Sequence, residues 1–188
     1  MKKITKLTVA SMCAALALIC FSLLRIEIPM GLGLTGKIYI GHAFIILAAL
    51  LTGPKYGGLA GAVGLTLADI LAGYVTSAPP TFVAKLLIGL TAGGIAYPLC
   101  HLDTAVHKER IVAAACIGAS IVNIVTEPLL RFAFKFFVLG LPYQVASVSA
   151  TNCAISMAAS ALPSAIVAYL VYQALASSVL QHNLGLSK

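Results

Sequence analysis

The stretch that decides the fold is GPKYGGLAGAVGLTLADILAGYVTSAPPTFVAKLLIGLTAGGIAY, from Gly53 to Tyr97. It has the composition of two apolar helices joined by a short polar turn, and each helix carries one ionisable residue, Asp69 in the first and Lys85 in the second. Asp69 lies just before the expected end of the first helix at Tyr74. Lys85 lies just after Pro80, which suits the first turn of the second helix. At about 1.5 Å per residue, both side chains are expected about 7 to 8 Å inside the same membrane face, in one polar layer.

The composition predicts an integral membrane protein. Of the 188 residues, 61% are apolar and 9% are charged, and the mean hydropathy is +1.04, whereas soluble proteins are about 25% charged. A chain of this length has room for about six membrane helices of about 20 residues, so we expect one six-helix domain over residues 1–188 and no soluble domain. The net charge of +7 is interpreted as membrane orientation and not as nucleic-acid affinity, because the basic residues are scattered.

The five cysteines lie in apolar runs at irregular spacing. This pattern is typical of buried thiols, and it favours neither a disulfide framework nor a metal site.

The apolar runs predict a compact all-α bundle of six transmembrane helices, at about 7–24, 39–51, 56–74, 80–100, 111–139 and 143–180. Residues 25–37 contain Pro29 and three glycines and are expected to form a loop. The basic start and the first apolar run could also be a signal peptide, but the run continues to Leu24, which favours an anchored helix. Pro163 is expected to kink the sixth helix. One side of the third helix is expected to be a close-packing face of small residues, namely Gly57, Gly61, Gly64, Ala68 and Ala72.

The basic residues of the connections predict the orientation of the bundle. Six helices place both termini on one side of the membrane. The termini and the even-numbered connections contain Lys2, Lys3, Lys6, Lys55, Lys108, Arg110 and Lys188, whereas the odd-numbered connections contain only Arg25 and Lys37. By the positive-inside rule, both termini are expected in the cytoplasm.

The polar residues of the helices then gather in the outer half of the membrane. Asn123, Glu127 and Arg131 are spaced by four and share one face of the fifth helix. Asn152, with Ser149 one turn earlier, forms a similar stripe on the sixth helix. An ionisable group at membrane depth costs at least about 2.5 to 3.5 kcal/mol, so such groups usually pair with one another or line a site.

Aromatic residues are expected at the edge of this polar region, which suggests an outward-opening pocket for a small polar solute that contains a ring. His42, at the start of a helix, fits a cap or an interface better than a ligand contact. The candidate substrate-binding residues are Tyr39, Asp69, Tyr74, Phe82, Lys85, Asn123, Glu127, Arg131 and Asn152.

Each charged residue also has a purely structural interpretation. Asp69 and Lys85 could form an ion pair that ties two helices together. Glu127 could do no more than satisfy Arg131, and Arg131 and Lys135 could extend toward the outer headgroups.

The sequence does not favour an enzyme, because it has no Gly-x-Ser-x-Gly motif, no phosphate-binding loop and no histidine-rich metal motif. A transporter acting alone is also unexpected, because the halves show no inverted repeat and no polar path continues through the inner leaflet. A protein that holds a solute on the outer side without an inner path needs partners.

Several motifs resemble one known family. They are Gly41-His42-Ala43-Phe44, then LLTGPKYGGLAG at residues 50–61, then Asp69, then Pro80-Thr81-Phe82-x-x-Lys85-x-x-x-Gly89. In this order and spacing they are similar to the substrate-binding S component of energy-coupling factor (ECF) vitamin transporters. The resemblance covers nearly the whole chain.

The resemblance implies a multi-pass protein of the bacterial plasma membrane that binds a vitamin at its outer face. It would dock on a transmembrane T component with two ATP-hydrolysing subunits and topple to release the solute, with no cofactor of its own. Ala10 and Ala14 of the first helix would form the docking face, unless they serve ordinary packing inside the bundle.

The resemblance is strongest to members that handle hydroxymethylpyrimidine or pyridoxine. The absence of tryptophan argues against thiamin, whereas riboflavin, pantothenate, folate and cobalamin stay open. The residues are also compatible with a stand-alone secondary transporter or with a membrane scaffold.

Overall fold

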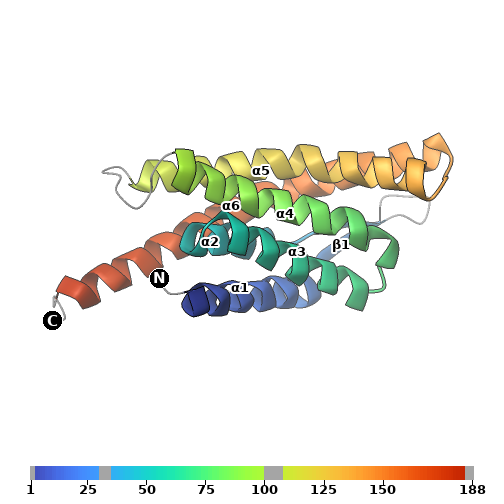
Figure 1. The fold of residues 1–188 in the computed structure, drawn as a ribbon. Helices are drawn as coiled ribbons and strands as arrows, with labels where there is room; N and C mark the ends of the chain where they lie inside the picture. The colour runs from blue at the N-terminus through green and yellow to red at the C-terminus, as the bar shows by residue number, and fades with distance from the viewer. Residues whose placement is uncertain (1–2, 30–34, 100–107, 185–188) are drawn as a thin grey trace.

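The order of the elements follows the predicted series of helices. The computed structural model describes residues 3–29, 35–99 and 108–184. These contain six α-helices: α1 (Lys3–Leu23), α2 (His42–Thr52), α3 (Pro54–Leu71), α4 (Ala78–Gly94), α5 (Lys108–Ala133) and α6 (Tyr143–Leu184). The six-helix bundle is therefore confirmed. In Figure 1 the helices lie side by side, both termini lie at one end of the bundle, and the connection between α5 and α6 lies at the other.

Shorter elements extend or join these helices. The 3-10 turn η1 (Val75–Ser77) leads into α4, and the π-helices η2 (Ile95–Leu99) and η3 (Phe134–Val138) prolong α4 and α5. Pro163 lies inside α6, which continues past it. The charged connection predicted at 101–110, and the terminal Lys2 and Lys188, lie wholly or partly outside the described residues.

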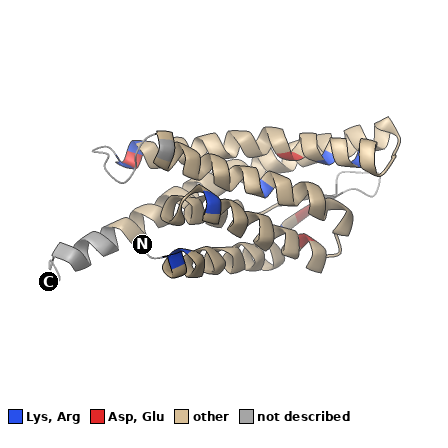
Figure 2. Cartoon of the chain, viewed as in Figure 1, with Lys and Arg blue, Asp and Glu red and all other residues tan. Residues whose placement is uncertain are grey.

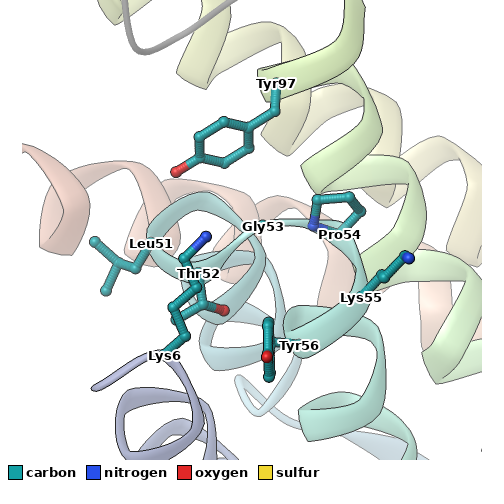
Figure 3. Close-up of a pocket in the computed structure, with 8 residues that line it drawn as sticks. All are labelled: Lys6, Leu51, Thr52, Gly53, Pro54, Lys55, Tyr56 and Tyr97. Atoms are coloured by element: carbon teal, nitrogen blue, oxygen red, sulfur yellow. The ribbon is translucent and has the colours of Figure 1, made fainter. Parts of the chain in front are cut away.

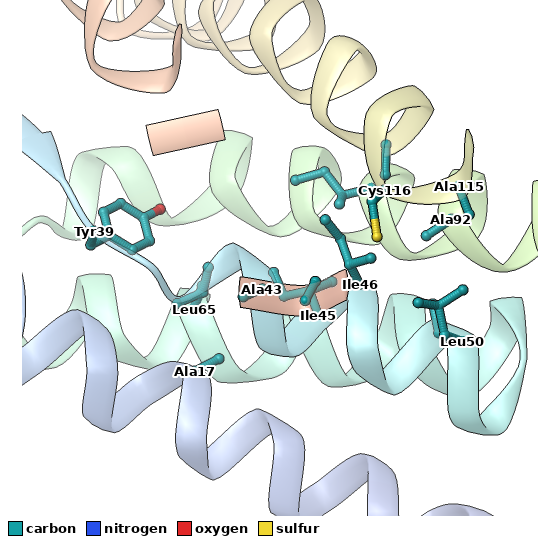
Figure 4. Packing of buried hydrophobic residues seen from close by; sticks show 14 of the residues in the cluster. Ala17, Tyr39, Ala43, Ile45, Ile46, Leu50, Leu65, Ala92, Ala115 and Cys116 are labelled. Carbon is teal, nitrogen blue, oxygen red and sulfur yellow. The ribbon is translucent and has the colours of Figure 1, made fainter. Parts of the chain in front are cut away.

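The short helix α2 lies at the centre of the bundle. Nine of its eleven residues are buried, which is the pattern of a helix that is covered on every side. Ile45, Ile46 and Leu50 of α2 pack against Cys116 of α5 and Ala92 of α4 in one core cluster, as Figure 4 shows. Its other two residues, Phe44 and Leu51, are half-buried, so this central helix contacts its neighbours on every side.

Glycines allow α3 to pack at very short distances against its neighbours. A Cβ on Gly57 would lie 2.3 Å from the Cα of Ala49 in α2, and a Cβ on Gly64 would lie 2.7 Å from the carbonyl oxygen of Ala14 in α1. On the other side, a Cβ on Gly89 of α4 would lie 2.4 Å from the backbone nitrogen of Gly58. The predicted small-residue face of α3 is thus confirmed as a packing surface.

Four helical segments are long and apolar enough to cross a membrane. They are Lys3–Leu23, Val75–Tyr97, Lys108–Val138 and Tyr143–Ala176. With its eleven residues, α2 is shorter than a spanning helix. The chain is therefore an all-α, multi-pass membrane protein in which α2 is enclosed by longer helices.

A β-hairpin replaces the loop that is predicted at residues 25–37. Strands β1 (Ile26–Pro29) and β2 (Thr35–Ile38) pair antiparallel, with Ile26 opposite Ile38 and Glu27 opposite Lys37. The next residue, Tyr39, binds α6, because its N–H donates to Ser160 Oγ at 3.3 Å. The sequence predicts a loop whose ordered parts need neighbours. The ordered parts are these two strands, and α6 supplies the surface on which so short a hairpin becomes stable.

Ala10 and Ala14 lie where α1 packs on the rest of the chain. Ala10 is 4% exposed and contacts a cluster that includes Leu47 and Ala60, and Ala14 is half-buried beside Gly64. Within this chain the two residues take part in ordinary packing of the bundle, which is the alternative that the sequence left open.

The glycine contacts predict a specific destabilisation. Gly89→Ala places a methyl group against the backbone of Gly58, so we expect the unfolding free energy in detergent to fall by at least about 1–3 kcal/mol. Gly94→Ala is the matched control on the same helix, because its Cβ would meet nothing within 4 Å. Thermal melts of the two variants that coincide would contradict the close helix contact.

Candidate functional site

The ammonium group of Lys85 is fully buried at the junction of three helices. The Lys85 side chain is 0% exposed. Its Nζ pairs with Glu127 Oε2 and donates to Asn123 Oδ1 at 3.3 Å, both on α5. It also lies 2.8 Å from His42 Nε2 at the start of α2. These contacts provide the charge compensation and hydrogen bonds that a buried ammonium group needs.

Glu127 connects this interior cluster to Arg131, which lies nearer the end of α5. Its Oε1 atom accepts from Arg131 Nη2 at 3.3 Å, one helical turn away. Arg131 Nη1 in turn donates to Ser77 Oγ of η1 at 2.9 Å. The Glu127 carboxylate therefore forms ion pairs with two cations, Lys85 in the interior and Arg131 toward the end of α5.

A second ionic cluster forms around Asp69. Its Oδ1 atom pairs with Lys37 Nζ of β2 at 3.2 Å, and its Oδ2 atom accepts from Thr81 Oγ1 at 2.7 Å. No ion pair joins Asp69 to Lys85 within the described chain, so the predicted pair is wrong, and two clusters replace the single polar layer. The hairpin brought Lys37 within reach of Asp69, while α5 brought Glu127 to Lys85.

The environment of Lys37 has opposing effects on the pKa of its ammonium group. Its Nζ lies 3.0 Å from the centre of the Tyr74 ring, a favourable cation–π contact. Burial lowers the pKa of Lys37 to about 8, Asp69 opposes this shift, and Arg131 adds to it. The Tyr74 hydroxyl donates to Glu27 Oε1 at 2.8 Å, and this links η1 to β1.

A cavity of about 220 Å³ lies next to the buried cluster. It is enclosed by β2, η1, the end of α5 with η3, and the facing part of α6. It lies at the end of the bundle opposite the chain termini. In Figure 2 the α5 helix shows both acidic and basic residues toward this end. The lining residues are Lys37, Tyr74, Thr76, Ser77, Arg131, Lys135, Ser149, Asn152, Cys153, Ser156 and Met157.

Two buried donor atoms of the lining residues lack a hydrogen-bond partner. They are Arg131 Nε and Asn152 Nδ2. Lys135 does not extend away from the bundle as the sequence suggested, because its Nζ donates to Ser149 Oγ at 2.7 Å across the cavity wall. A buried donor without a partner costs about 1–3 kcal/mol, so each of these two side chains would gain from an acceptor that reached it.

The predicted site residues divide into three groups. Tyr74, Arg131 and Asn152 line the cavity. The buried residues Tyr39, Asp69, Lys85, Asn123 and Glu127 lie outside its lining, in the core or in the two ionic clusters. Phe82 is 39% exposed and is not a lining residue, because the inward face of α4 is set by Thr81 and Lys85, one turn apart.

Sequence reasoning missed His42, Lys37 and Lys135 as parts of the site. The position of His42 favours a cap or an interface, yet its ring lies between Lys85 and the ring of Tyr39, whose centroid is 4.5 Å from that of His42. Lys135 follows Arg131 by four residues, and that spacing alone places it on the same face of α5. No sequence signal indicates that Lys37 folds back over the bundle.

A second cavity lies at the end of the bundle where the chain begins. It has a volume of about 430 Å³ and is lined by Lys6, Leu51, Thr52, Gly53, Pro54, Lys55, Tyr56 and Tyr97, which Figure 3 shows around the junction of α2 and α3. The Tyr97 hydroxyl donates to the carbonyl oxygen of Leu50 at 2.7 Å. This cavity is remote from both ionic clusters.

Known proteins resemble this chain in sequence and in fold. Residues 1–177 match a family described as the S component of the ECF-type riboflavin transporter. A curated protein of Pyrococcus woesei, described as an uncharacterized protein in a gap 3' region, is 42% identical over 71 residues, or 38% of this chain. The chain matches 45% of the length of that relative.

Two solved structures have the same fold. One is the S component of a bacterial ECF transporter, with a TM-score of 0.64 and 21% identity over 95% of this chain and 99% of the other. The second is the S component for biotin of an ECF-type ABC transporter, with a TM-score of 0.61 and 18% identity over 92% and 95%.

The buried ion pair predicts an asymmetric response to substitution. Glu127→Gln leaves the Lys85 ammonium group without its carboxylate, so we expect the unfolding free energy to fall by about 3–5 kcal/mol, measured by thermal unfolding in detergent. The double variant Lys85→Met/Glu127→Leu removes both charges and is expected to recover most of this loss.

Glu109→Gln is the control, because Glu109 is exposed at the start of α5. A Glu127→Gln protein as stable as this control would show that Lys85 does not depend on Glu127.

Proposed function

Because this chain belongs to the family of S components of ECF-type transporters, we propose that it captures a small water-soluble vitamin or vitamin precursor in the 220 Å³ cavity. The cavity itself is the observation that carries this proposal. Its lining residues come from β2, η1, α5, η3 and α6, and two of them, Arg131 and Asn152, have buried donors without a partner beside an ionic cluster. An arrangement of fixed donors around a small space is suited to binding and not to covalent chemistry.

The cavity is proposed to open toward the outside. Lys6 and Lys55 lie at the end of the bundle that carries the termini, and this enrichment of basic residues predicts a cytoplasmic face. The outer position would give the protein access to a scarce solute before any transport step.

The size of the cavity narrows the choice of substrate. Ligand pockets usually measure about 300–1,000 Å³, so about 220 Å³ favours a single-ring compound. Hydroxymethylpyrimidine and pyridoxine, the candidates from the sequence, fall in this class. Riboflavin, which the matched family description names, has three fused rings and would require the cavity to widen. Folate and cobalamin are larger than riboflavin and would require the cavity to widen further, whereas pantothenate is small but has no ring.

Transport is proposed to depend on partners. A transmembrane T component and two ATP-binding subunits would supply the ATP hydrolysis, and this chain would act as the exchangeable binding subunit without a cofactor. The side of α1 that points away from the bundle is available for docking. Its exposed residues include Ser11, Met12, Ala15 and Leu16.

One test of the proposed function is whether the chain alone binds the solute. Native mass spectrometry and calorimetry of the purified protein in detergent should show one solute bound per chain. Asn152→Ala should weaken binding by about tenfold, because one hydrogen bond is lost. The control, Thr151→Ala, changes the neighbouring exposed residue of α6 and should bind like the wild type.

The second prediction concerns transport. Liposomes that contain only this chain should not accumulate the solute, whereas addition of the T component and ATP-binding subunits should allow ATP-dependent uptake. Counterflow in liposomes with this chain alone would instead show a secondary transporter. A protein that binds no solute in either assay would favour a membrane scaffold.

A further inference from the structure

Every charged side chain that lines the outer cavity is a cation. The lining contains Lys37, Arg131 and Lys135, which come from three different positions around the space, and no carboxylate of the described chain joins them there. A pocket for a neutral solute has no need of three positive groups, because each of them is costly to hold at membrane depth.

The nearby carboxylates do not balance these cations. Asp69 pairs with Lys37, and Glu127 is divided between Arg131 and the buried Lys85. The cluster thus contains four cations and two carboxylates. Among the described residues, Lys135 forms no ion pair.

The unpartnered atoms are all hydrogen-bond donors, so they favour the same kind of ligand as the excess positive charge does. Arg131 Nε is buried without an acceptor, and a guanidinium group can only donate hydrogen bonds. Lys135 Nζ has three protons, and Ser149 Oγ accepts one of them. Asn152 Nδ2 adds another donor to the wall. These donors are complementary to an acceptor with negative charge.

We infer that the substrate of this cavity carries an oxyanion, a carboxylate or a phosphate ester, which binds between Arg131 on one side and Lys135 on the other. This inference rests on the proposed function and narrows it. An oxyanion would accept from Arg131 Nε and Lys135 Nζ together and would offset the excess charge, with the strength typical of charge-assisted hydrogen bonds. Neutral hydroxymethylpyrimidine, pyridoxine and riboflavin would leave that charge uncompensated.

The binding of an anion should weaken as the pH rises through the titration of Lys37. The charged and titratable groups around Lys37 are Asp69 of α3, Arg131 of α5 and Arg25 before β1. Glu27 is its cross-strand neighbour in β1, and the ring of Tyr74 lies against its ammonium group. Burial lowers the pKa of Lys37 to about 8, so the protonated, anion-attracting form is lost above that value. Affinity should fall roughly tenfold from about pH 7 to about pH 9.

Lys37→Met should flatten this profile. If the slope stayed unchanged in Lys37→Met, the pH dependence would belong to another group. An anion affinity that rises with pH would contradict the charge argument.

The decisive experiment compares ligands that share a ring and differ in charge. Calorimetry with the wild-type chain in detergent should rank 4-pyridoxate or pyridoxine 5'-phosphate at least about tenfold above pyridoxine, and nicotinate above nicotinamide. The order of the first two compounds distinguishes a carboxylate from a phosphate ester. Mass spectrometry of the solute retained from growth medium gives the same answer without a chosen panel.

Substitutions at Lys135 test whether the preference for anionic ligands arises in the cavity. Lys135→Gln should remove most of the anion preference, Lys135→Arg should keep it, and Lys108→Gln, at the exposed start of α5, should not change it. Thermal melts of each variant show that it is folded.

If the neutral member of each pair bound as tightly as the anion, the inference would be overturned while the proposed capture function stood. A protein that bound neither the panel nor any solute from the medium would overturn both.

Discussion

The burial of one ammonium group constrains the whole bundle. Lys85 has no exposed surface, and its buried side chain finds polar partners only because Glu127, Asn123 and His42 surround it. These partners lie on α2 and α5, so satisfying one lysine fixes α2, α4 and α5 relative to one another. An apolar contact tolerates sliding of one helix along the next, but a buried ion pair with several hydrogen bonds does not, because any shift leaves a polar group unsatisfied.

Close packing makes that geometry possible. Gly57, Gly64 and Gly89 remove side chains at the points where α3 meets α2, α1 and α4. The helix backbones therefore approach closely enough for short α2 to be enclosed and for the buried polar groups to meet. In lipid, where helices gain nothing from leaving water, such close contact and interhelical hydrogen bonds are the main attractive forces.

The position of the cavity follows from this framework. Glu127 holds Arg131 on the side that faces the opening, and Arg131 in turn holds η1 through Ser77. The hairpin covers the same region and is fixed on α6 beside Tyr39. The wall of the cavity is therefore rigid on the α5 side. A rigid wall preserves unpartnered donors, since flexible side chains would turn to satisfy each other.

The sequence by itself determined the membrane class, the six helices, the glycine packing face of α3 and the face shared by Asn123, Glu127 and Arg131. Composition and helical periodicity encode these features locally. Only the tertiary structure decided which charges pair, because Asp69 and Lys85 each had several partners within reach once the chain folded. It also decided that Lys37 and Lys135 line the cavity, that Phe82 does not, and that Ala10 is buried. Partner choice depends on how helices rotate and on where a hairpin folds back, and those contacts join residues distant in the sequence, which no local pattern records.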